Sequence, residues 1–231
     1  VVLTGTSGYQ AYSWNNNSSA SSITVTDSNE YILTVTSVNG CEGSTSIIVD
    51  VNPLPTATVS TVSGNFDFCD GSSLTLEAPS GASAYQWYKD GNAVASATSS
   101  SFSAIASGNY NVEVTSSDGC SSLSSAQAVT KNALPTASIS NGSALSFCDG
   151  GSVTLSAPAN MTYSWSTGAT TQSITQSSSG QVGLTITDAN GCSSVASPVT
   201  VNVYSVPTLA VSAASSTSIC QGQSVTLQAS G

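Results

Sequence analysis

Cysteine is the residue type with the most distinctive chemistry in this chain of 231 residues, which contains six cysteines and no histidine. Cysteines either bind zinc, usually from CxxC pairs and together with histidine, or form disulfides in oxidising compartments. Because no CxxC pair is present, we expect disulfides, an extracellular location and no zinc site. The cysteines form two series that recur at intervals of 72 to 79 residues: Cys41, Cys120 and Cys192, and Cys69, Cys148 and Cys220.

The residue types needed for most catalytic sites are missing. The only basic residues are Lys89 and Lys131, and without histidine the Ser/His/Asp and Cys/His arrangements are excluded. A carboxylate pair for glycoside hydrolysis, or an oxygen cluster for Ca²⁺, would have to come from acids in turns and on exposed strands. We expect these acids to form turns and to face solvent, and we predict no enzyme activity, no metal and no cofactor. The acids concerned are Asp27, Asp67, Asp70, Glu77, Glu113, Asp118 and Asp188.

A strand and a tight turn precede each cysteine of the first series. Residues 107–120 read SGNYNVEVTSSDGC, in which Tyr110, Val112 and Val114 alternate with polar residues. This alternation predicts a half-buried strand, and the Asp-Gly pair after it predicts a hairpin turn. The block recurs at residues 29–41 and 180–192. Three copies indicate a protein built of tandem repeats.

Other fixed points recur with the same period. Each cysteine of the second series precedes a glycine and then a Leu-Thr-Leu or Val-Thr-Leu strand, and a Tyr-x-Trp triplet recurs three times along the chain. The triplets end at Trp14, Trp87 and Trp165, which we expect in the core and not on a sugar-binding surface. The second repeat is longer, and residues 87–96 contain an extra hairpin that turns at Asp90-Gly91.

Proline-containing junctions at residues 51–57, 131–137 and 204–209 separate the repeats and predict stiff connections. The chain opens and closes in the same phase of the repeat, so we expect it to be part of a longer array. The predicted domains are residues 1–52, a first repeat that lacks its first strand, residues 53–132 and 133–204, two complete repeats, and residues 205–231, the first two strands of a fourth.

The landmarks of each repeat resemble those of immunoglobulin-like sandwiches, with Val-x-Leu on the second strand, Trp on the third and Gly-x-Tyr-x-Val before the last turn. Tyr110 occupies the position of the tyrosine corner, and Ala78 and Val112 replace the usual inter-sheet disulfide. The run FCDGGSVTLSAP and its counterparts resemble the immunoglobulin-like and PKD-like repeats of large surface adhesins of gliding bacteria, commonly exported by the type IX route. The resemblance implies an all-β fold of tandem immunoglobulin-like β-sandwich repeats in an extended rod. It places Trp14, Trp87, Trp165 and Tyr110 in the cores.

The pairing of the cysteines stays open within this framework. In a complete sandwich, Cys69 and Cys120 lie at opposite ends, about 20 Å apart, whereas the Cα atoms of a disulfide are about 4.4–6.8 Å apart. Head-to-tail repeats would bring Cys69 to Cys192, as an inter-repeat disulfide. Cys148 would then pair beyond the last residue given, and Cys120 before Val1. If the short repeats lack one strand, a bridge within a repeat becomes possible, and free thiols are the third alternative.

Charge and composition limit the partners. The net charge of −10 argues against nucleic acid and anionic membranes, and no apolar run is long enough to span a bilayer. Sparse charge leaves sheet edges poorly protected, which favours lateral self-association into filaments. We expect a structural stalk or filament region of an extracellular cell-surface adhesin, which projects from the surface and transmits force. The expected partners are further repeats of the same chain and an unknown surface glycan or protein ligand. The alternative is an accessory, carbohydrate-binding module of a secreted hydrolase.

Overall fold

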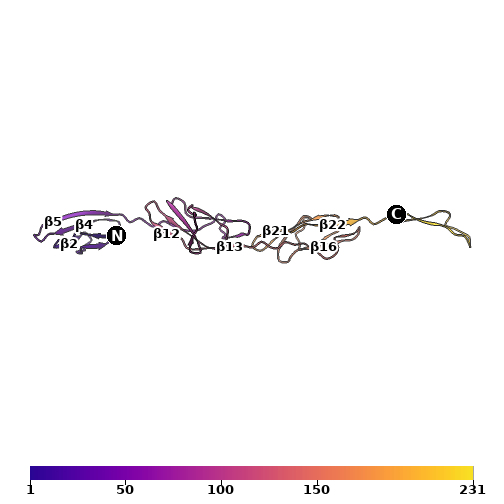
Figure 1. Cartoon of the computed structure of the whole chain (residues 1–231), viewed down its shortest axis with the longest axis horizontal. Helices are drawn as coiled ribbons and strands as arrows, with labels where there is room; N and C mark the ends of the chain where they lie inside the picture. Colours follow the sequence, from indigo (N-terminus) through magenta and orange to yellow (C-terminus); the bar gives the residue numbers. More distant parts are fainter. Residues whose placement is uncertain (231) are drawn as a thin grey trace. The chain divides into compact units, whose positions relative to one another are not determined.

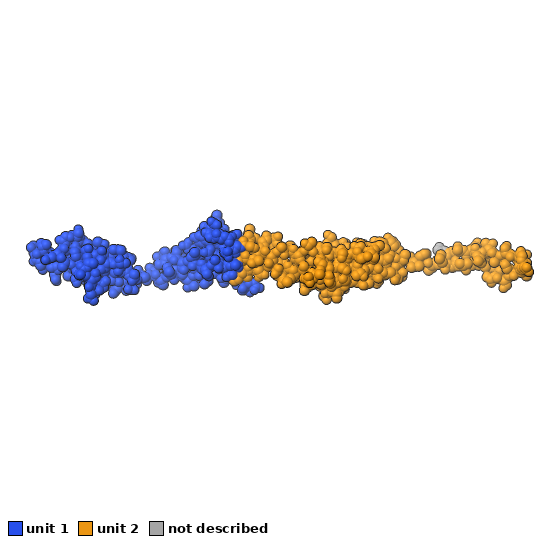
Figure 2. Space-filling view, turned by 90° about the horizontal axis from the view of Figure 1, so that it is seen from below, with its two compact units in different colours: residues 1–65, 75–103, 108–128 blue, residues 66–74, 104–107, 129–231 orange. Residues whose placement is uncertain are grey.

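The computed structural model describes residues 1–230. Every regular secondary-structure element in this range is a β-strand. The predicted all-β class is therefore confirmed. No helix that could cross a membrane occurs in this described part. The chain forms two compact units, coloured separately in Figure 2: unit 1 comprises residues 1–65, 75–103 and 108–128, and unit 2 comprises residues 66–74, 104–107 and 129–231. The unit boundary divides residues 53–132, so the repeat boundaries given above stay predictions.

Unit 1 begins with two small antiparallel sheets (Figure 1). One pairs β1 (Val2–Thr4) with β3 (Ser22–Thr24), and the other has the order β2 (Ala11–Trp14), β4 (Asn29–Thr36), β5 (Glu42–Val49). Alternation places every second side chain between the sheets, where Leu3 lies opposite Ile23 and Trp14 lies opposite Leu33. Together with Val25, Tyr31 and Val49 they form a buried core.

The remaining strands of unit 1 surround β11 (Gly108–Thr115), the strand predicted from residues 107–120. β11 pairs antiparallel with β8 (Ala84–Lys89) and with β12 (Ser121–Leu123). β8 continues into β9 (Asn92–Ala93) through Asp90 and Gly91, whose φ angles of 49° and 78° are those of a type I′ turn, which confirms the extra hairpin. Three strands contain residues of both units: β7 (Leu74–Glu77), β10 (Ser101–Ala104) and β13 (Gln127–Asn132).

Unit 2 contains several short sheets. Three of them have three strands each, in the orders β14-β16-β18, β17-β20-β21 and β15-β22-β19, and β23 pairs with β24. β6 pairs in parallel with the end of β13. The strands are β6 (Asp67–Cys69), β14 (Ser140–Asn141), β15 (Ser146–Cys148), β16 (Val153–Ser156), β17 (Thr162–Trp165), β18 (Ser173–Gln176), β19 (Gly180–Val182), β20 (Leu184–Thr187), β21 (Ser193–Val195), β22 (Val199–Tyr204), β23 (Ala210–Ala213) and β24 (Leu227–Ser230).

The first strand of the repeat at residues 133–204 is not continuous. It consists of two short pieces, because β14 pairs antiparallel with β16 and β15 then pairs in parallel with β22. The segment passes from one sheet to the other, so Ile139 before the crossing and Phe147 after it both pack against the core. At the corresponding residues 56–60 of the preceding repeat, only an isolated bridge from Ser60 to Glu77 forms.

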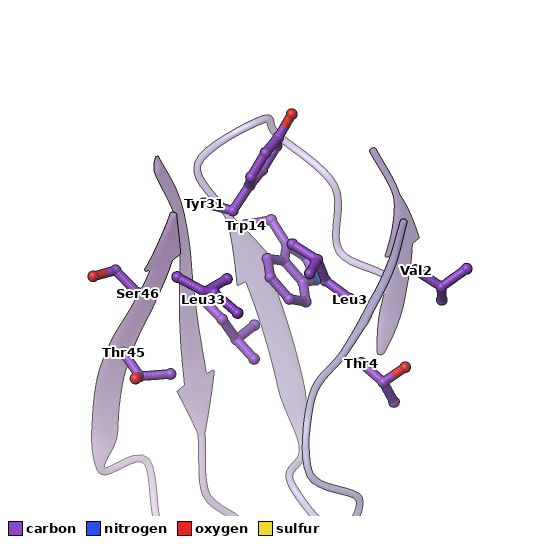
Figure 3. Close-up of a pocket in the computed structure, with 9 residues that line it drawn as sticks. Val2, Leu3, Thr4, Trp14, Tyr31, Leu33, Thr45 and Ser46 are labelled. Atoms are coloured by element: carbon purple, nitrogen blue, oxygen red, sulfur yellow. The ribbon is translucent and has the colours of Figure 1, made fainter. Parts of the chain in front are cut away.

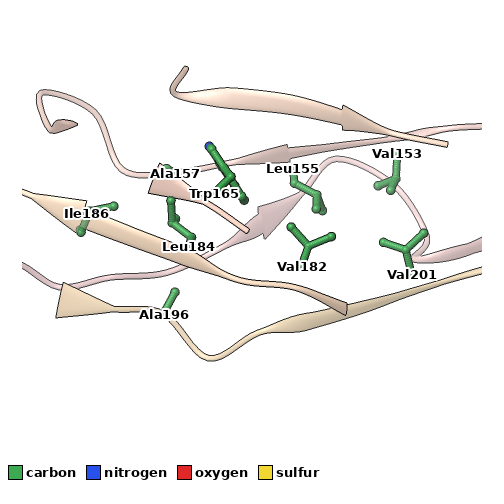
Figure 4. Close-up of a cluster of buried hydrophobic side chains, with 9 residues drawn as sticks. All are labelled: Val153, Leu155, Ala157, Trp165, Val182, Leu184, Ile186, Ala196 and Val201. Carbon is green, nitrogen blue, oxygen red and sulfur yellow. The ribbon is translucent and has the colours of Figure 1, made fainter. Parts of the chain in front are cut away.

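The core of unit 2 lies between these sheets. Figure 4 shows Leu155 in one cluster with Trp165, Val182, Leu184 and Val201. Leu155 belongs to the sheet β14-β16-β18, whereas the other four belong to the sheets β17-β20-β21 and β15-β22-β19. All are buried, because the inward position on each strand is apolar and the outward position is usually Ser or Thr. The sheets therefore meet as two layers around one apolar interior.

Replacing Leu155, which has no exposed surface, by Ala is expected to destabilise unit 2 by about 2–5 kcal/mol, because the substitution leaves a cavity in the core. Urea unfolding, followed by hydrogen exchange of the amides of residues 153–204, measures this change. Val195→Ala is the control: its side chain is 75% exposed, and a change within about 0.5 kcal/mol is expected. Equal effects of the two substitutions would contradict the assignment of the core.

Candidate functional site

A disulfide between Cys69 and Cys192 is the distinctive chemical feature of unit 2. The sulfur atoms are 2.06 Å apart and the Cα atoms 5.5 Å apart. Cys69 is the last residue of β6, and Cys192 follows the turn after β20 and is completely buried. The bond joins residues 123 positions apart in the sequence. It is the pairing described above as inter-repeat.

A four-residue turn presents Cys192 to its partner. The backbone N–H of Asp188 donates to the carbonyl of Cys192 at 3.0 Å, and the Asp188 carboxylate accepts bonds from the amides of Asn190 and Cys192, each at 2.9 Å. Gly191 has φ of 80°, a conformation that favours glycine. Asp188, considered above for Ca²⁺, thus uses its carboxylate to shape the turn.

The same turn holds the other two cysteines of the first series. Ser37 and Ser116 replace Asp188, and their hydroxyls accept the amide N–H of Cys41 and Cys120 at 3.2 and 3.3 Å. Their backbone N–H groups donate to the carbonyls of the same cysteines at 2.9 Å. The turn therefore presents the three cysteines in the same way, although only Cys192 is bonded.

The parallel pairing of β6 with β13 positions Cys69, which lies opposite Asn132. The amide of Asp70 donates to the carbonyl of Asn132 at 2.8 Å, and the amide of the Asn132 side chain donates to Asp67 at 3.2 Å. Lys131 Nζ lies 2.7 Å from Asp70 Oδ1. The hydrogen bond from Lys131, the amide of Gly71 and the lysine charge together lower the pKa of Asp70 below its ordinary value.

The four other cysteines, Cys41, Cys120, Cys148 and Cys220, are unbonded in the described chain. A Cys148–Cys192 bridge, the alternative within one repeat, is not the one present. Cys148 lies opposite Tyr204, at the end of β22, whereas Cys192 precedes β21 and the beginning of β22. Cys148 therefore lies beside the end of β22, whereas Cys192 lies before its beginning, so the two residues are at opposite ends of this strand. Cys120 Sγ is 3.8 Å from the carbonyl oxygen of Asn52.

The residues expected in the cores are buried in the structure. Trp14, Trp87 and Trp165 donate their indole N–H groups to the backbone carbonyls of Ala20, Ser99 and Thr171 at 2.8–2.9 Å. Tyr110 is buried, and the ring of Phe102 lies 5.8 Å from that of Trp87 and 5.7 Å from that of Tyr110. The three tryptophans therefore lie in the cores, with their indole N–H groups bonded to the backbone.

Several of the acids have local partners in the structure. Glu113 accepts a hydrogen bond from the Tyr88 hydroxyl at 2.9 Å, which raises the pKa of Tyr88. Asp90 contacts Lys89 at 2.8 Å and the amide of Asn109 at 2.8 Å. Within residues 1–230 there is no group of three or more His, Cys, Asp or Glu residues that could hold a metal ion.

An open groove of about 440 Å³ lies in unit 1, between β1 and β5. Figure 3 shows Leu3, Trp14 and Leu33 between the strand that carries Val2 and Thr4 and the strand that carries Thr45 and Ser46. The sequence indicated that residues 1–52 lack a first strand, but not that the space stays open. The lining residues are Val2, Leu3, Thr4, Trp14, Tyr31, Leu33, Thr45, Ser46 and Ile47.

Comparison with known proteins identifies the fold. The family model described as "Ig-like domain CHU_C associated" matches residues 55–135. No curated protein matches the chain. This family match and the sheet topology confirm the predicted tandem immunoglobulin-like β-sandwich fold.

Solved structures that resemble the chain include fibronectin(III)-like modules of Clostridium thermocellum CbhA, with 11% identity, a TM-score of 0.38, and coverage of 65% of this chain and 94% of the other. A 1.5-MDa bacterial ice-binding adhesin matches at 14% identity and a TM-score of 0.37, over 86% of this chain and 88% of the other. A glucan-utilisation protein of Bacteroides ovatus, SGBP-B, matches at 17% identity and a TM-score of 0.20, over 91% of this chain and 64% of the other.

Removing the disulfide by Cys69→Ala and Cys192→Ala together is expected to destabilise unit 2 by about 2–4 kcal/mol, because the unfolded chain loses a cross-link. Urea unfolding followed by hydrogen exchange of unit 2 measures the loss. Cys148→Ala, which removes an exposed and unbonded thiol, is the control. Non-reducing digestion with pepsin at acid pH should release a peptide pair that contains Cys69 and Cys192, and a Cys148–Cys192 pair would contradict the structure.

Lys131→Met is expected to raise the pKa of the Asp70 carboxyl toward its ordinary value of 3.8, because the substitution removes a hydrogen bond and a positive charge. The lowered pKa means that the ionised form is favoured by folding, so this stabilisation is present above the unfolded pKa and is lost as the pH falls through the folded pKa. Titration of the side-chain carboxyl by NMR measures the pKa. Lys89→Met should leave Asp70 unchanged, and equal shifts in both variants would refute the pairing.

Proposed function

We propose that this chain is a structural repeat region of an extracellular bacterial adhesin, a stalk or filament segment that transmits force and catalyses no reaction. The observation that carries this proposal is the Cys69–Cys192 disulfide, which joins residues 123 positions apart. A chain pulled from its ends cannot lengthen between the two cysteines while this bond is intact. The bond therefore limits extension even after the surrounding strands have separated.

The parallel strand pairs support the same role. β6 pairs in parallel with β13, and β15 pairs in parallel with β22. When the disulfide is reduced, tension that enters at the beginning of β15 and leaves at the end of β22 loads the hydrogen bonds between these strands in shear. Bonds loaded in shear break together, whereas bonds at the end of a hairpin open one at a time. This geometry suits a segment that must hold under tension.

Composition supports a location outside the cell. Disulfides persist in oxidising environments, and a chain with only two basic residues offers few sites to proteases that cut after lysine or arginine. Our finer assignment, a surface adhesin of the gliding-motility type exported by the type IX route, rests on the resemblance of the repeats. Lateral contact between exposed strand edges would give the filament form of the same protein.

The alternative, a carbohydrate-binding module of a secreted hydrolase, has less support. Such modules bind sugars on exposed aromatic faces, whereas the three tryptophans are buried here and their indole N–H groups are bonded to backbone carbonyls. Of the other aromatic residues, Tyr9 and Tyr204 are exposed.

Stretching single chains between their termini tests the mechanical role. Under oxidising conditions the fully extended chain should be shorter by roughly 400 Å than under reducing conditions, since about 3.3–3.6 Å per residue is withheld across the bonded segment. The Cys69→Ala/Cys192→Ala variant should show the longer extension in both conditions. Equal extension of the oxidised and reduced parent chains, or specific binding of soluble glycans by the parent chain, would overturn the proposal.

A further inference from the structure

The two residues of the Cys69–Cys192 disulfide differ in their access to solvent. Cys192 has no exposed surface, whereas Cys69, the last residue of β6, is half-buried and is followed by an exposed run at residues 70–73. Thiol–disulfide exchange begins when a thiolate attacks one of the two sulfurs, and its rate depends on which sulfur can be reached. A small thiol can therefore approach the bond at Cys69 but not at Cys192.

Hydrogen bonds that do not involve the disulfide hold both cysteines in place. β6 pairs with β13 beside Cys69, and the amide of Asp70 donates to the carbonyl of Asn132 at 2.8 Å. The Asp188 carboxylate accepts the amide N–H of Cys192 at 2.9 Å, and the amide of Asp188 donates to the Cys192 carbonyl at 3.0 Å. These contacts keep the two sulfur atoms close when the bond opens, so that closing it again is an intramolecular reaction.

The surroundings of the two cysteines also differ in charge. Burial and the adjacent Asp188 carboxylate both disfavour a thiolate at Cys192 once the bond is open. Next to Cys69, the carboxylate of Asp70 lies 2.7 Å from Lys131 Nζ, so its charge is partly neutralised. Reduced Cys192 consequently remains a protonated thiol that reacts with the one sulfur placed beside it, that of Cys69.

We propose that Cys69 is a site of reversible S-thiolation, at which a low-molecular-weight thiol attacks the disulfide, remains bound as a mixed disulfide and frees Cys192. Cys192 is the resolving cysteine, which attacks the modified Cys69 and restores the bond. This inference rests on the proposed function in one respect, because it names the chemical route by which the bond that limits extension is released. The route itself requires no tension on the chain.

The opening reaction consumes two small thiols. The thiolate of the first attacks the Cys69 sulfur, the bond between the two cysteines breaks, and the Cys192 sulfur leaves with the electron pair and takes up a proton. The second thiolate attacks the sulfur of the bound small thiol, which releases a small disulfide and leaves Cys69 to take up the other proton. One protein disulfide and two small thiols thus give two protein thiols and one small disulfide. The reverse sequence closes the bond, with the small disulfide as oxidant.

Trapping the intermediate in the oxidised full chain tests this assignment without any substitution. N-ethylmaleimide first blocks the four unbonded thiols, and a limiting amount of reduced glutathione is then added. The reaction is quenched with acid, and isotopically labelled N-ethylmaleimide marks each newly freed thiol. Peptide mapping by mass spectrometry should find glutathione on Cys69 and the label on Cys192, in at least about tenfold excess over the reverse arrangement.

Two matched variants test the roles of the cysteines in the reduced chain. In Cys192→Ser, which lacks the resolving thiol, oxidised glutathione should accumulate as a stable mixed disulfide on Cys69. In Cys69→Ser, the buried Cys192 should be modified at least about tenfold more slowly, because its reaction requires a local opening of the structure. Cys148, which is exposed and unbonded, is the internal reference and should react at the same rate in both variants. In concentrated urea, Cys69 and Cys192 should react equally fast.

Glutathione trapped on Cys192 as often as on Cys69 would overturn the assignment, and so would equal rates of modification in the two folded variants. Amide exchange of residues 153–204 shows whether Cys69→Ser has kept its fold, and if it has not, the trapping result on the parent chain decides. The test is separate from that of the mechanical role. A chain that stretches equally when oxidised and reduced would leave the trapping result unchanged, and glutathione trapped on Cys192 would leave the limit on extension unchanged.

Discussion

Each immunoglobulin-like sandwich in this chain depends on one edge segment that crosses from one sheet to the other. A two-layer sandwich of about 75 residues buries little apolar surface per residue, so an uncovered side weakens it noticeably. In unit 2, β14 completes one sheet and β15 completes the other, and the residues between them close the core. Where this segment is absent, beside β1 and β5, the core opens into a groove.

The pairing of this edge segment also sets the positions of the cysteines. β6 and β15 both end on a cysteine, and the parallel pairing carries that cysteine to the end of the last strand of its sandwich. The turn before β21 presents Cys192 with its backbone amide already bonded to Asp188. The disulfide therefore joins two elements that are each held by their own hydrogen bonds. Because its position is set by backbone pairing, the bond needs little sequence beyond Phe-Cys and Gly-Cys at the two sites.

Much of this architecture could be predicted from the sequence, because the local rules were clear. The alternation of Tyr110, Val112 and Val114 indicated a strand with one buried face, and the pair Asp90-Gly91 indicated a tight turn. The tryptophans lie on strands with the same alternation, and the structure buries them. In each case the signal lies within about ten residues of sequence.

Other features depend on contacts that no local pattern reveals. The first strand splits because Ile139 and Phe147 reach the same core from different sheets, and both halves look like ordinary strand in the sequence. The cysteine pairing could not be decided from the sequence, because it depends on the end of the sandwich at which each cysteine lies. The pair of Lys131 and Asp70 was missed because the two residues lie far apart in sequence and meet only through the pairing of β6 with β13.

The disulfide also changes what a single break in the backbone would do. The residues between Cys69 and Cys192 include the exposed turn at Asp90-Gly91 and the turn that ends at Cys120. A protease that cuts at either turn would leave both fragments covalently attached, and the polypeptide on each side of the cut would stay tethered. Such a chain would lose its continuity only after reduction or after a cut outside the cross-linked segment, so the bond gives the protein tolerance to damage as well as stability.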